Sequence, residues 1–336
     1  MELPAHTGAM GNVLRGGVPA FRLIEDQLGQ VKELISEQLA GSARAAGTNQ
    51  LLEYVNAHSG KMIRPGLLLL SGMCCGRITN EHIRIAAIVE MIHNATLLHD
   101  DVLDEGQKRR GLPTVNNLWG NEFAVLLGDL LLSRVFKMCA DLEPQITTII
   151  AAIAARTCEG EMRQIIERQN WQLSESEYID IITEKTAAFF SNCCRLGALL
   201  ANAADIYVQS LGRFGLNAGV AFQITDDLLD ITGDESQTGK MLGSDVDKNK
   251  LTLAVIHLLR AVDETERPAI INKLNAAEKR KDALAEMLRS YGSLEYACSQ
   301  AQGFVAKAVR ALAGLKESDA KEALIRTAMF MADRTT

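Results

Sequence analysis

The sequence predicts an all-α protein, a single-domain bundle of roughly a dozen helices. Long runs rich in Ala, Leu and Ile repeat their apolar residues at helical spacing. No stretch alternates apolar and polar residues as a strand does, and aromatic residues make up only 5% of the chain. With six prolines in 336 residues, no linker rich in Pro, Gly and Ser divides the sequence. We therefore expect one helical domain over residues 17–336, after a flexible, glycine-interrupted tail at 1–16.

The composition excludes several functional classes. A formal charge of −7 and the lack of a basic stripe argue against a nucleic-acid partner. The seven cysteines show no C-x-x-C spacing and lie in apolar stretches, as is typical of reduced core residues. No signal peptide is recognisable, and no apolar run reaches the ~18 residues of a membrane span. We expect a cytoplasmic protein without a membrane span.

Two cations precede the first strongly apolar helix. The helix expected over 21–40 is amphipathic, which indicates a packing role. The turn HSGKMIRP, residues 58–65, follows it and places Lys61 and Arg64 three residues apart at a helix start. Both can face one anion there. The alternative is a pair of surface cations whose stems cover apolar side chains.

The stretch LLHDDVLDEGQKRRG, residues 97–111, is the first candidate metal site. On a helix, Asp100 and Asp104 stand one turn apart on the same face, with Asp101 beside them. Like charges this close repel, and Lys108 lies beyond a glycine where the helix can already have ended. Mg²⁺ suits such a site, because it takes hard oxygen ligands and bridges carboxylates to phosphates. A solvated acidic helix end is the alternative.

The helix that delivers this motif, expected over 83–98, is apolar on most sides and therefore central. His93 lies two turns before Asp100 on the same face. A lone histidine on a buried helix is more often a hydrogen-bonded core residue than a ligand. Further on, the run EGEMRQ, residues 159–164, is typical of a solvated face. We assign it no catalytic role.

The aspartate pattern returns in QITDDLLDITGDESQTGK, residues 223–240. Its three aspartates again follow an apolar helical run and again precede a lysine. Three glycines on one face of that run would allow a neighbouring helix to approach closely, at a cost of ~1 kcal/mol each relative to alanine. These glycines are Gly212, Gly215 and Gly219. Two helices that each bring aspartates to one site, with cations around it, could hold a diphosphate and its metal ions.

The paired aspartate motifs, with R-R-G after the first and G-K after the second, resemble those of the trans-prenyl diphosphate synthases, or polyprenyl synthetases. The resemblance runs from about residue 60 to the C-terminus. It implies the isoprenoid synthase fold, with a deep central cavity, and Mg²⁺ as cofactor, with three ions when substrate is bound. It implies six metal-site aspartates, of which Asp101 would be an outer partner: Asp100, Asp101, Asp104, Asp226, Asp227 and Asp230.

The same resemblance implies two substrate sites. The isopentenyl diphosphate site would use Lys61, Arg64, His93 and Arg110. The allylic diphosphate site would use Arg109, Lys185, Thr186, Gln223, Lys240 and Lys250. In the segment that carries Lys250, Asn249 and Ala254 replace the family's usual glycine and proline, so the local loop is expected to differ.

The implied reaction is a sequential head-to-tail condensation. The allylic diphosphate ionises, isopentenyl diphosphate attacks the carbocation through its double bond, and a proton is lost, with no protein base evident. An apolar cavity would exclude water from the cation. The implied catalytic set is Asp100, Asp104, Arg109, Lys185, Asp226 and Lys240. The resemblance also implies a homodimer, and the product can pass to a membrane-bound enzyme.

Three rival classes fit less well. A terpene cyclase usually carries an N-x-x-x-S/T-x-x-x-E/D second motif, whereas this chain has DDLLD. A di-iron bundle needs paired Glu-x-x-His motifs, and the one from Glu90 to His93 has no counterpart. The non-catalytic subunit of a heteromeric synthase would have lost aspartates that this chain keeps.

Product length depends on the residues just before the first motif. Each helical turn of ~5.4 Å corresponds to about one isoprene unit. Ala95 and Thr96, five and four positions before Asp100, are small where members of the family that stop at farnesyl or geranylgeranyl diphosphate often carry an aromatic ring. We therefore favour a product of thirty to fifty carbons, suited to a quinone side chain. The alternatives are a short-chain synthase and small residues kept only for helix packing.

Overall fold

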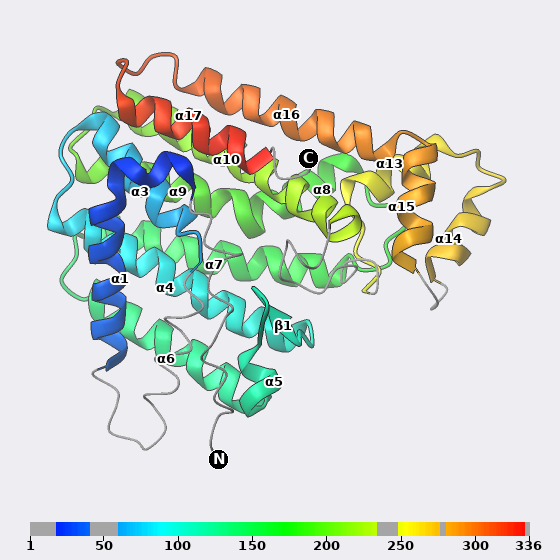
Figure 1. Ribbon diagram of the computed structural model, residues 1–336, viewed down its shortest axis with the longest axis horizontal. Helices are drawn as coiled ribbons and strands as arrows, with labels where there is room; N and C mark the ends of the chain where they lie inside the picture. Colours follow the sequence, from blue (N-terminus) through cyan, green and yellow to red (C-terminus); the bar gives the residue numbers. More distant parts are fainter. Residues whose placement is uncertain (1–17, 41–59, 234–247, 276–279, 333–336) are drawn as a thin grey trace, which may run out of the picture.

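The computed structural model describes residues 18–40, 60–233, 248–275 and 280–332, and the tail expected at 1–16 lies outside them. The first half of the chain forms η1 (Pro19–Ile24), α1 (Glu25–Ala40), α3 (Ile63–Cys75), α4 (Asn80–Leu103), α5 (Val115–Trp119), α6 (Asn121–Cys139) and α7 (Pro144–Ile166). The second half forms α8 (Glu175–Ile182), the π-helical turn η2 (Thr183–Ala187), α9 (Ala188–Leu200), α10 (Asp205–Thr232), α13 (Leu253–Ala261), α14 (Arg267–Asn275), α15 (Arg280–Ser290), α16 (Ser293–Ala311) and α17 (Asp319–Ala332). The all-α prediction is confirmed (Figure 1).

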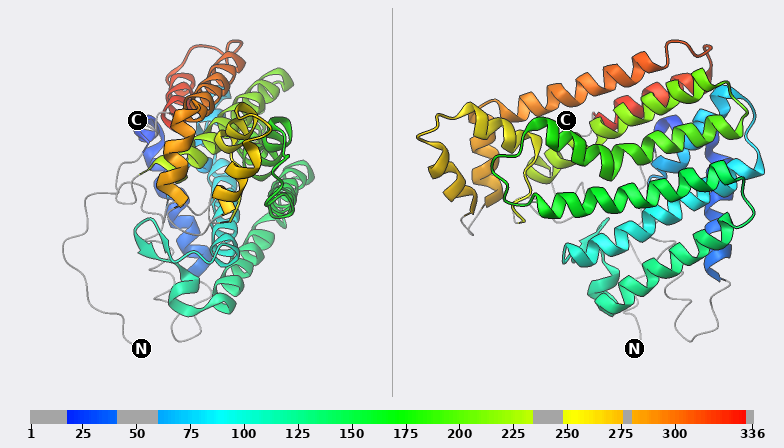
Figure 2. Two further views of the ribbon diagram at one scale, coloured as in Figure 1. Left: turned by 90° about the vertical axis from the view of Figure 1, so that its right-hand side faces the viewer. Right: turned by 180° about the vertical axis from the view of Figure 1, so that it is seen from behind.

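Helix α10 is the element around which the others assemble. It packs along α9 and α16 and also contacts η2, α17, α13 and α15. The bundle is elongated, with α1 at one end and α14 and α15 at the other (Figures 1 and 2). Every helix in the described part is too short or too polar to cross a lipid bilayer. Because α10 touches so many partners, its C-terminal aspartates are fixed by most of the fold.

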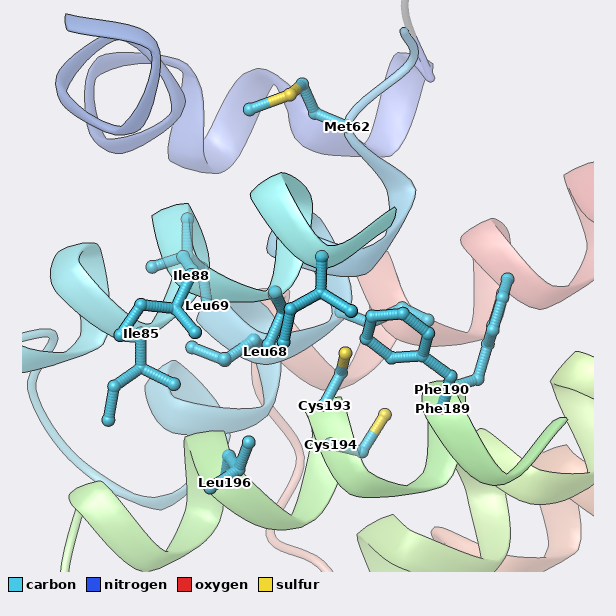
Figure 3. Packing of buried hydrophobic residues seen from close by; sticks show 14 of the residues in the cluster. Met62, Leu68, Leu69, Ile85, Ile88, Phe189, Phe190, Cys193, Cys194 and Leu196 are labelled. Atoms are coloured by element: carbon cyan, nitrogen blue, oxygen red, sulfur yellow. The ribbon is translucent and has the colours of Figure 1, made fainter. Parts of the chain in front are cut away.

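A tightly packed apolar core holds α3, α4 and α9 together. Leu68 and Leu69 of α3, Ile88 of α4 and Phe190 of α9 interdigitate with almost no exposed surface (Figure 3). Burying each such side chain contributes ~1.5–3 kcal/mol. This core sets the position of α4, which ends in the first aspartate motif.

The cysteines match the predicted reduced state, but one of them is exposed. All seven are free thiols, and Cys193 and Cys194 are buried beside the leucines of α3 (Figure 3). Burial raises the pKa of Cys194 to about 12, so this thiol stays protonated. Cys158 on α7 is exposed, contrary to the expectation of core cysteines.

A two-stranded hairpin follows the first motif, although no strand was expected. Strands β1 (Lys108–Arg109) and β2 (Leu112–Pro113) are antiparallel, with Arg109 paired to Leu112. The two turn residues, Arg110 and Gly111, have φ of 54° and 78°. Positive φ at both positions is the requirement of a tight type I′ turn. The hairpin is too short to show alternation in the sequence, yet it fixes the directions of both arginines.

Candidate active site

The first aspartate motif forms the C-terminal end of α4. Asp100 and Asp101 lie in the last turn, and Asp104 caps it with an N–H that donates to the Asp100 carbonyl at 2.7 Å. Lys108 lies past the helix end in β1, so it is not a helical i,i+4 neighbour of Asp104. The expected early end of the helix is confirmed. The negative charge of the motif is neutralised from elsewhere in the fold.

Asp101 is the aspartate of this motif that binds Arg109. It is buried, and it accepts hydrogen bonds from Nε and Nη2 of Arg109 at 2.9 and 2.7 Å. Such a charge-assisted fork is among the strongest polar contacts in proteins. Asn116 also donates to the Asp101 carbonyl at 3.2 Å. Asp101 therefore orients Arg109.

The second motif divides its aspartates in the same way. Asp227 is buried and accepts hydrogen bonds from the Tyr178 hydroxyl at 2.7 Å and from the Gln223 amide at 2.8 Å. The Lys250 ammonium forms an ion pair with it at 3.1 Å. Asp226 and Asp230, one turn apart, are half-buried. In both motifs the middle aspartate is buried, while the first and third are half-buried.

Arg109 lies between the two motifs. Burial by itself lowers the pKa of Arg109, but its hydrogen bonds to Asp101 and the charges of Asp100 and Asp226 raise it above its ordinary value overall. A charge acts this strongly only at short range. The charges of both motifs, from Asp100 of α4 and Asp226 of α10, therefore act on one cation.

Asp104 is paired with cations that the sequence did not point to. It forms an ion pair with Lys248 and another with Arg168 at 3.6 Å. The Lys248 ammonium also donates to the Asp104 carbonyl at 2.8 Å. Lys248 lies two residues before Lys250, so this short segment contributes a cation to each motif. These contacts span more than sixty residues of sequence and leave no local pattern.

Asp100 carries the most perturbed carboxyl group of the site. Burial raises the pKa of Asp100 to about 6, while the charge of Lys185 lowers it and the charges of Glu161 and Asp104 raise it. A carboxylate that is poorly solvated and surrounded by other carboxylates gains most from a bound cation.

We expect Asp100 to make the stability of the metal-free protein depend on pH. Its folded pKa of about 6 lies above the ordinary value of 3.8, so the folded state binds more protons between these values. The resulting stability is present in full below the unfolded pKa and is lost as pH rises through about 6. Urea unfolding in EDTA should show the wild type losing roughly 1 kcal/mol more than Asp100→Asn between pH 5 and 7. Parallel pH profiles would contradict this assignment.

The π-helical turn η2 connects α7 and α10 through Lys185 and Thr186. Lys185 donates to the Gln164 amide oxygen at 2.7 Å and forms an ion pair with Glu161. Thr186 donates to the Gln223 amide oxygen at 2.8 Å, and that amide in turn binds Asp227. Single π-helical turns inside helices occur frequently at functional sites. This turn links α7 and the second motif on α10 through polar side chains.

Two glycines make room for η2. A Cβ on Gly219 of α10 would lie 2.6 Å from the Cα of Ala187, and a Cβ on Gly160 of α7 would overlap the backbone of Lys185. Real Cβ atoms do not approach backbone so closely, so any side chain here would push the turn away. The close approach predicted for the glycine face of α10 is confirmed, whereas Gly160 was not anticipated.

A second group of cations lies at the start of α3. The Arg64 guanidinium lies over the rings of Phe189 and Phe190, 4.8 and 5.0 Å from their centroids. Lys61 is exposed, with its ammonium 5.1 Å from the Phe330 ring centroid. Burial lowers the pKa of Arg64, and the charges of Glu90 and Asp226 act in the opposite direction. The charge of Asp226 in the second motif is the smallest of the effects on Arg64.

The remaining predicted residues vary in how far the structure defines them. His93 is half-buried on α4, while Lys240 lies outside the described residues. Asn249 has φ of 52°, a left-handed conformation that favours glycine and that asparagine also adopts. Ala254 lies in the first turn of α13, where proline is also tolerated.

The two residues expected to control product length differ in exposure. Ala95 has no exposed surface, whereas Thr96 is half-buried and its hydroxyl donates to the His93 carbonyl at 2.8 Å. Ala95 belongs to the core cluster that also contains Leu127 and Leu131 of α6. The packing alternative is thus well founded for Ala95, and Thr96 is the more open of the two positions.

Several polar contacts of the site were not assigned from sequence. Glu161 and Gln164 lie in the run interpreted as a solvated face, yet both contact Lys185. Tyr178 binds Asp227 across 49 positions of sequence. For the run 159–164, the glycine between two glutamates was the sequence feature that could have indicated a close contact with another element. Tyr178 offered none, because its partner is set by the packing of α8 on α10.

The donor set fits hard divalent cations without forming a complete cage. Within residues 18–40, 60–233, 248–275 and 280–332, no three His, Cys, Asp or Glu side chains converge into a metal site of their own. Mg²⁺ normally takes one or two carboxylates and completes its shell with water and substrate phosphates. The half-buried first and third aspartates of each motif, such as Asp100 and Asp226, are suited to that partial role.

Comparison with known proteins agrees with this geometry. The family model described as polyprenyl synthetase matches residues 46–291. A short chain isoprenyl diphosphate synthase from Methanothermobacter thermautotrophicus is 33% identical over 93% of this chain and 98% of its own. An octaprenyl diphosphate synthase from Haemophilus influenzae is 34% identical over 93% of this chain and 95% of its own.

A solved structure gives the same answer for the fold. The polyprenyl synthase from Caulobacter crescentus CB15, complexed with calcium and isoprenyl diphosphate, superposes with a TM-score of 0.88 and 31% identity. The match covers 94% of this chain and 97% of that one. The family model and the full-length relatives leave one assignment: the chain belongs to the polyprenyl synthetase family of prenyltransferases.

Proposed function

We propose that this protein is an all-trans-polyprenyl diphosphate synthase that condenses isopentenyl diphosphate onto an allylic diphosphate to make a long-chain product. The proposal rests on Arg109, which binds Asp101 of the first motif at 2.7 Å and is also acted on by the charges of Asp100 and of Asp226 in the second motif. A site for a diphosphate and its metal ions needs carboxylates for the metal ions and arginines or lysines for the phosphates. A solvated helix end or an ion pair in the core needs no such combination.

The allylic diphosphate is assigned to the space between the motifs. Asp100, Asp104, Asp226 and Asp230 would hold Mg²⁺, which supplies charge neutralisation to the leaving diphosphate when bound. Arg109, Lys185 and Lys250 already form hydrogen bonds or ion pairs at the site, so they are positioned before substrate arrives. Positioned charges stabilise charge separation without reorganising. Lys240 is assigned to the same diphosphate from the sequence pattern alone.

Isopentenyl diphosphate is assigned to the second cationic group. Lys61, Arg64 and Arg110 would bind its diphosphate, with His93 nearby on α4. The rings of Phe189 and Phe190 cover the Arg64 guanidinium and keep water from one side of it. Among the residues placed here no protein base is evident, so we assign the final proton to the released diphosphate.

The test of this function is incorporation of radiolabelled isopentenyl diphosphate by the pure single chain. With farnesyl or geranyl diphosphate and Mg²⁺, we expect labelled prenyl diphosphates, and EDTA should abolish them. A chain that needs a second protein for any turnover would instead be the catalytic or non-catalytic subunit of a heteromeric synthase.

We assign a long chain, of thirty to fifty carbons, because small residues stand at positions 95 and 96 and because long-chain synthases are among the relatives. The short chain relative from Methanothermobacter thermautotrophicus, at nearly the same identity, supports the opposite outcome. Overall similarity therefore does not decide product length. The residues that line the path of the growing chain do.

We further propose a homodimer that uses the outer face of α6. This helix lies at the edge of the bundle (Figure 1), and its Leu126 and Phe136 are 66% and 71% exposed. Apolar side chains exposed to this degree on one helix are typical of an interface. Sedimentation should give a dimer at micromolar concentration, and Leu126→Asp with Phe136→Asp should give a monomer.

The matched control for the dimer is Ile206→Asp, because Ile206 is 60% exposed on α10, away from α6. This variant should remain dimeric. A stable wild-type monomer would contradict the proposal, and a dimer that survives both α6 substitutions would exclude this face.

A further inference from the structure

Glu90 is a buried carboxylate that the proposed reaction does not use. It lies on α4, three residues before His93, and only 2% of it is exposed. One of its oxygens, Oε2, is buried and has no hydrogen-bond partner among the residues that the structure describes. Buried polar atoms are nearly always hydrogen-bonded, and those that are not require an explanation. A buried carboxylate is tolerated when cations lie close to it.

The cations that act on Glu90 include Arg64 and Arg110, the two arginines assigned to isopentenyl diphosphate. Burial raises the pKa of Glu90, and the charges of Arg64, Arg110 and Lys32 act in the opposite direction. Arg64 and Glu90 act on each other. Burial lowers the pKa of Arg64, and the charge of Glu90 is the largest effect in the opposite direction. Lys32, by contrast, is an exposed residue of α1.

Both arginines are held in defined places. The rings of Phe189 and Phe190 cover Arg64. Arg110 adopts a left-handed backbone conformation in the hairpin turn, and its guanidinium lies directly against Gly60, where a side chain would overlap it. A non-glycine residue in this conformation costs of order 1 kcal/mol and is found where the surroundings determine it.

Two guanidinium groups near each other repel before any substrate binds. The charge of Arg110 lowers the pKa of Arg64, which is the expected sign of this repulsion. Glu90 is a buried carboxylate of α4 whose charge acts on both arginines. A neutral side chain of the same shape would remove the foremost opposing charge on Arg64 and leave its repulsion with Arg110 less compensated.

We infer that Glu90 is a positioning residue for isopentenyl diphosphate, a buried carboxylate that holds Arg64 and Arg110 together so that both can bind one diphosphate. The inference rests on the proposed function, since it assigns a supporting residue to that substrate. It predicts an effect on one substrate only. A role confined to core stability would affect both substrates or neither.

The experiment is steady-state kinetics of Glu90→Gln, which keeps the shape and removes the charge. We expect KM for isopentenyl diphosphate to rise at least tenfold, KM for the allylic diphosphate to stay within twofold, and the melting temperature to stay near that of the wild type. Glu81→Gln, an exposed carboxylate on the same helix, and Lys32→Ala, the third cation near Glu90, are the controls. Both should leave the two KM values within twofold.

A double-mutant cycle separates positioning from a general loss of charge. Glu90→Gln should combine non-additively with Arg110→Ala, because both affect the same pair, and additively with Lys61→Ala, because Lys61 is exposed beside Phe330. An unchanged KM for isopentenyl diphosphate in Glu90→Gln, or equal rises for both substrates, would overturn the inference.

Two further results keep the inference testable. If Glu90→Gln does not fold, Glu90→Asp keeps the charge but withdraws it by one methylene. It should raise KM for isopentenyl diphosphate severalfold, and a wild-type value in folded Glu90→Asp would overturn the inference. An inactive wild type in the same assay would refute the proposed function itself.

Discussion

Asp100→Ala and Asp226→Ala are each expected to lower turnover by several orders of magnitude and to leave a folded protein. Each removes a half-buried carboxylate assigned to the divalent cations, and each keeps its neighbours hydrogen-bonded to other groups. Without those cations the departing diphosphate is not neutralised. Circular dichroism and radiolabelled isopentenyl diphosphate incorporation measure the two halves of this expectation on the same samples.

The middle aspartates should behave differently. Asp101→Ala and Asp227→Ala each remove a buried carboxylate that pairs with a half-buried cation, Arg109 or Lys250, and breaking such a pair costs about 3 kcal/mol. We expect both to unfold at lower temperature than the wild type. Asp205→Ala, an exposed aspartate at the start of α10, is the control and should be silent. Near wild-type turnover in Asp100→Ala or Asp226→Ala would show that the metal assignment is wrong.

The second large effect is on product length. Ala95→Phe and Thr96→Phe should shift the products from thirty to fifty carbons toward fifteen or twenty, with the first condensation largely intact. Each helical turn of open space beside α4 admits about one isoprene unit of the product. A ring one turn before Asp100 would therefore block the growing product after few condensations. Reversed-phase chromatography of the dephosphorylated products measures the distribution directly.

Burial makes the two variants unequal. Ala95 has no exposed surface, so a ring there must also displace core side chains, at a cost of ~1–3 kcal/mol. Thr96 is half-buried and should accept the ring at lower cost. Thr96→Val, which removes the hydroxyl contact to the His93 carbonyl without adding bulk, is the control. An unchanged product distribution in both phenylalanine variants would show that positions 95 and 96 do not set product length.

The fold class and the location of the site could be predicted from sequence because both depend on short-range patterns. Helical spacing, the two DDxxD runs and the glycine face of α10 each lie within a few turns of one helix. The early end of α4 followed from local charge and a glycine. These features require no knowledge of which helices pack together.

The division of labour within each motif could not be predicted in this way. All three aspartates of a motif look alike in sequence, and the structure distinguishes them by distant partners: Arg109 in a hairpin, Tyr178 on α8 and Lys248 before α13. The hairpin has two-residue strands, too short for a periodic signal. The π-helical turn depends on Gly160, whose role appears only when α7 lies against it.

We propose that this single chain extends an allylic diphosphate with isopentenyl diphosphate to a long-chain product. The most direct measurement is chromatography of the dephosphorylated products made by the pure protein from farnesyl diphosphate, labelled isopentenyl diphosphate and Mg²⁺. We predict labelled prenyl alcohols of thirty to fifty carbons, lost on addition of EDTA. Products that stop at fifteen or twenty carbons would contradict the long-chain assignment, and the absence of any labelled prenyl alcohol would contradict the claim as a whole.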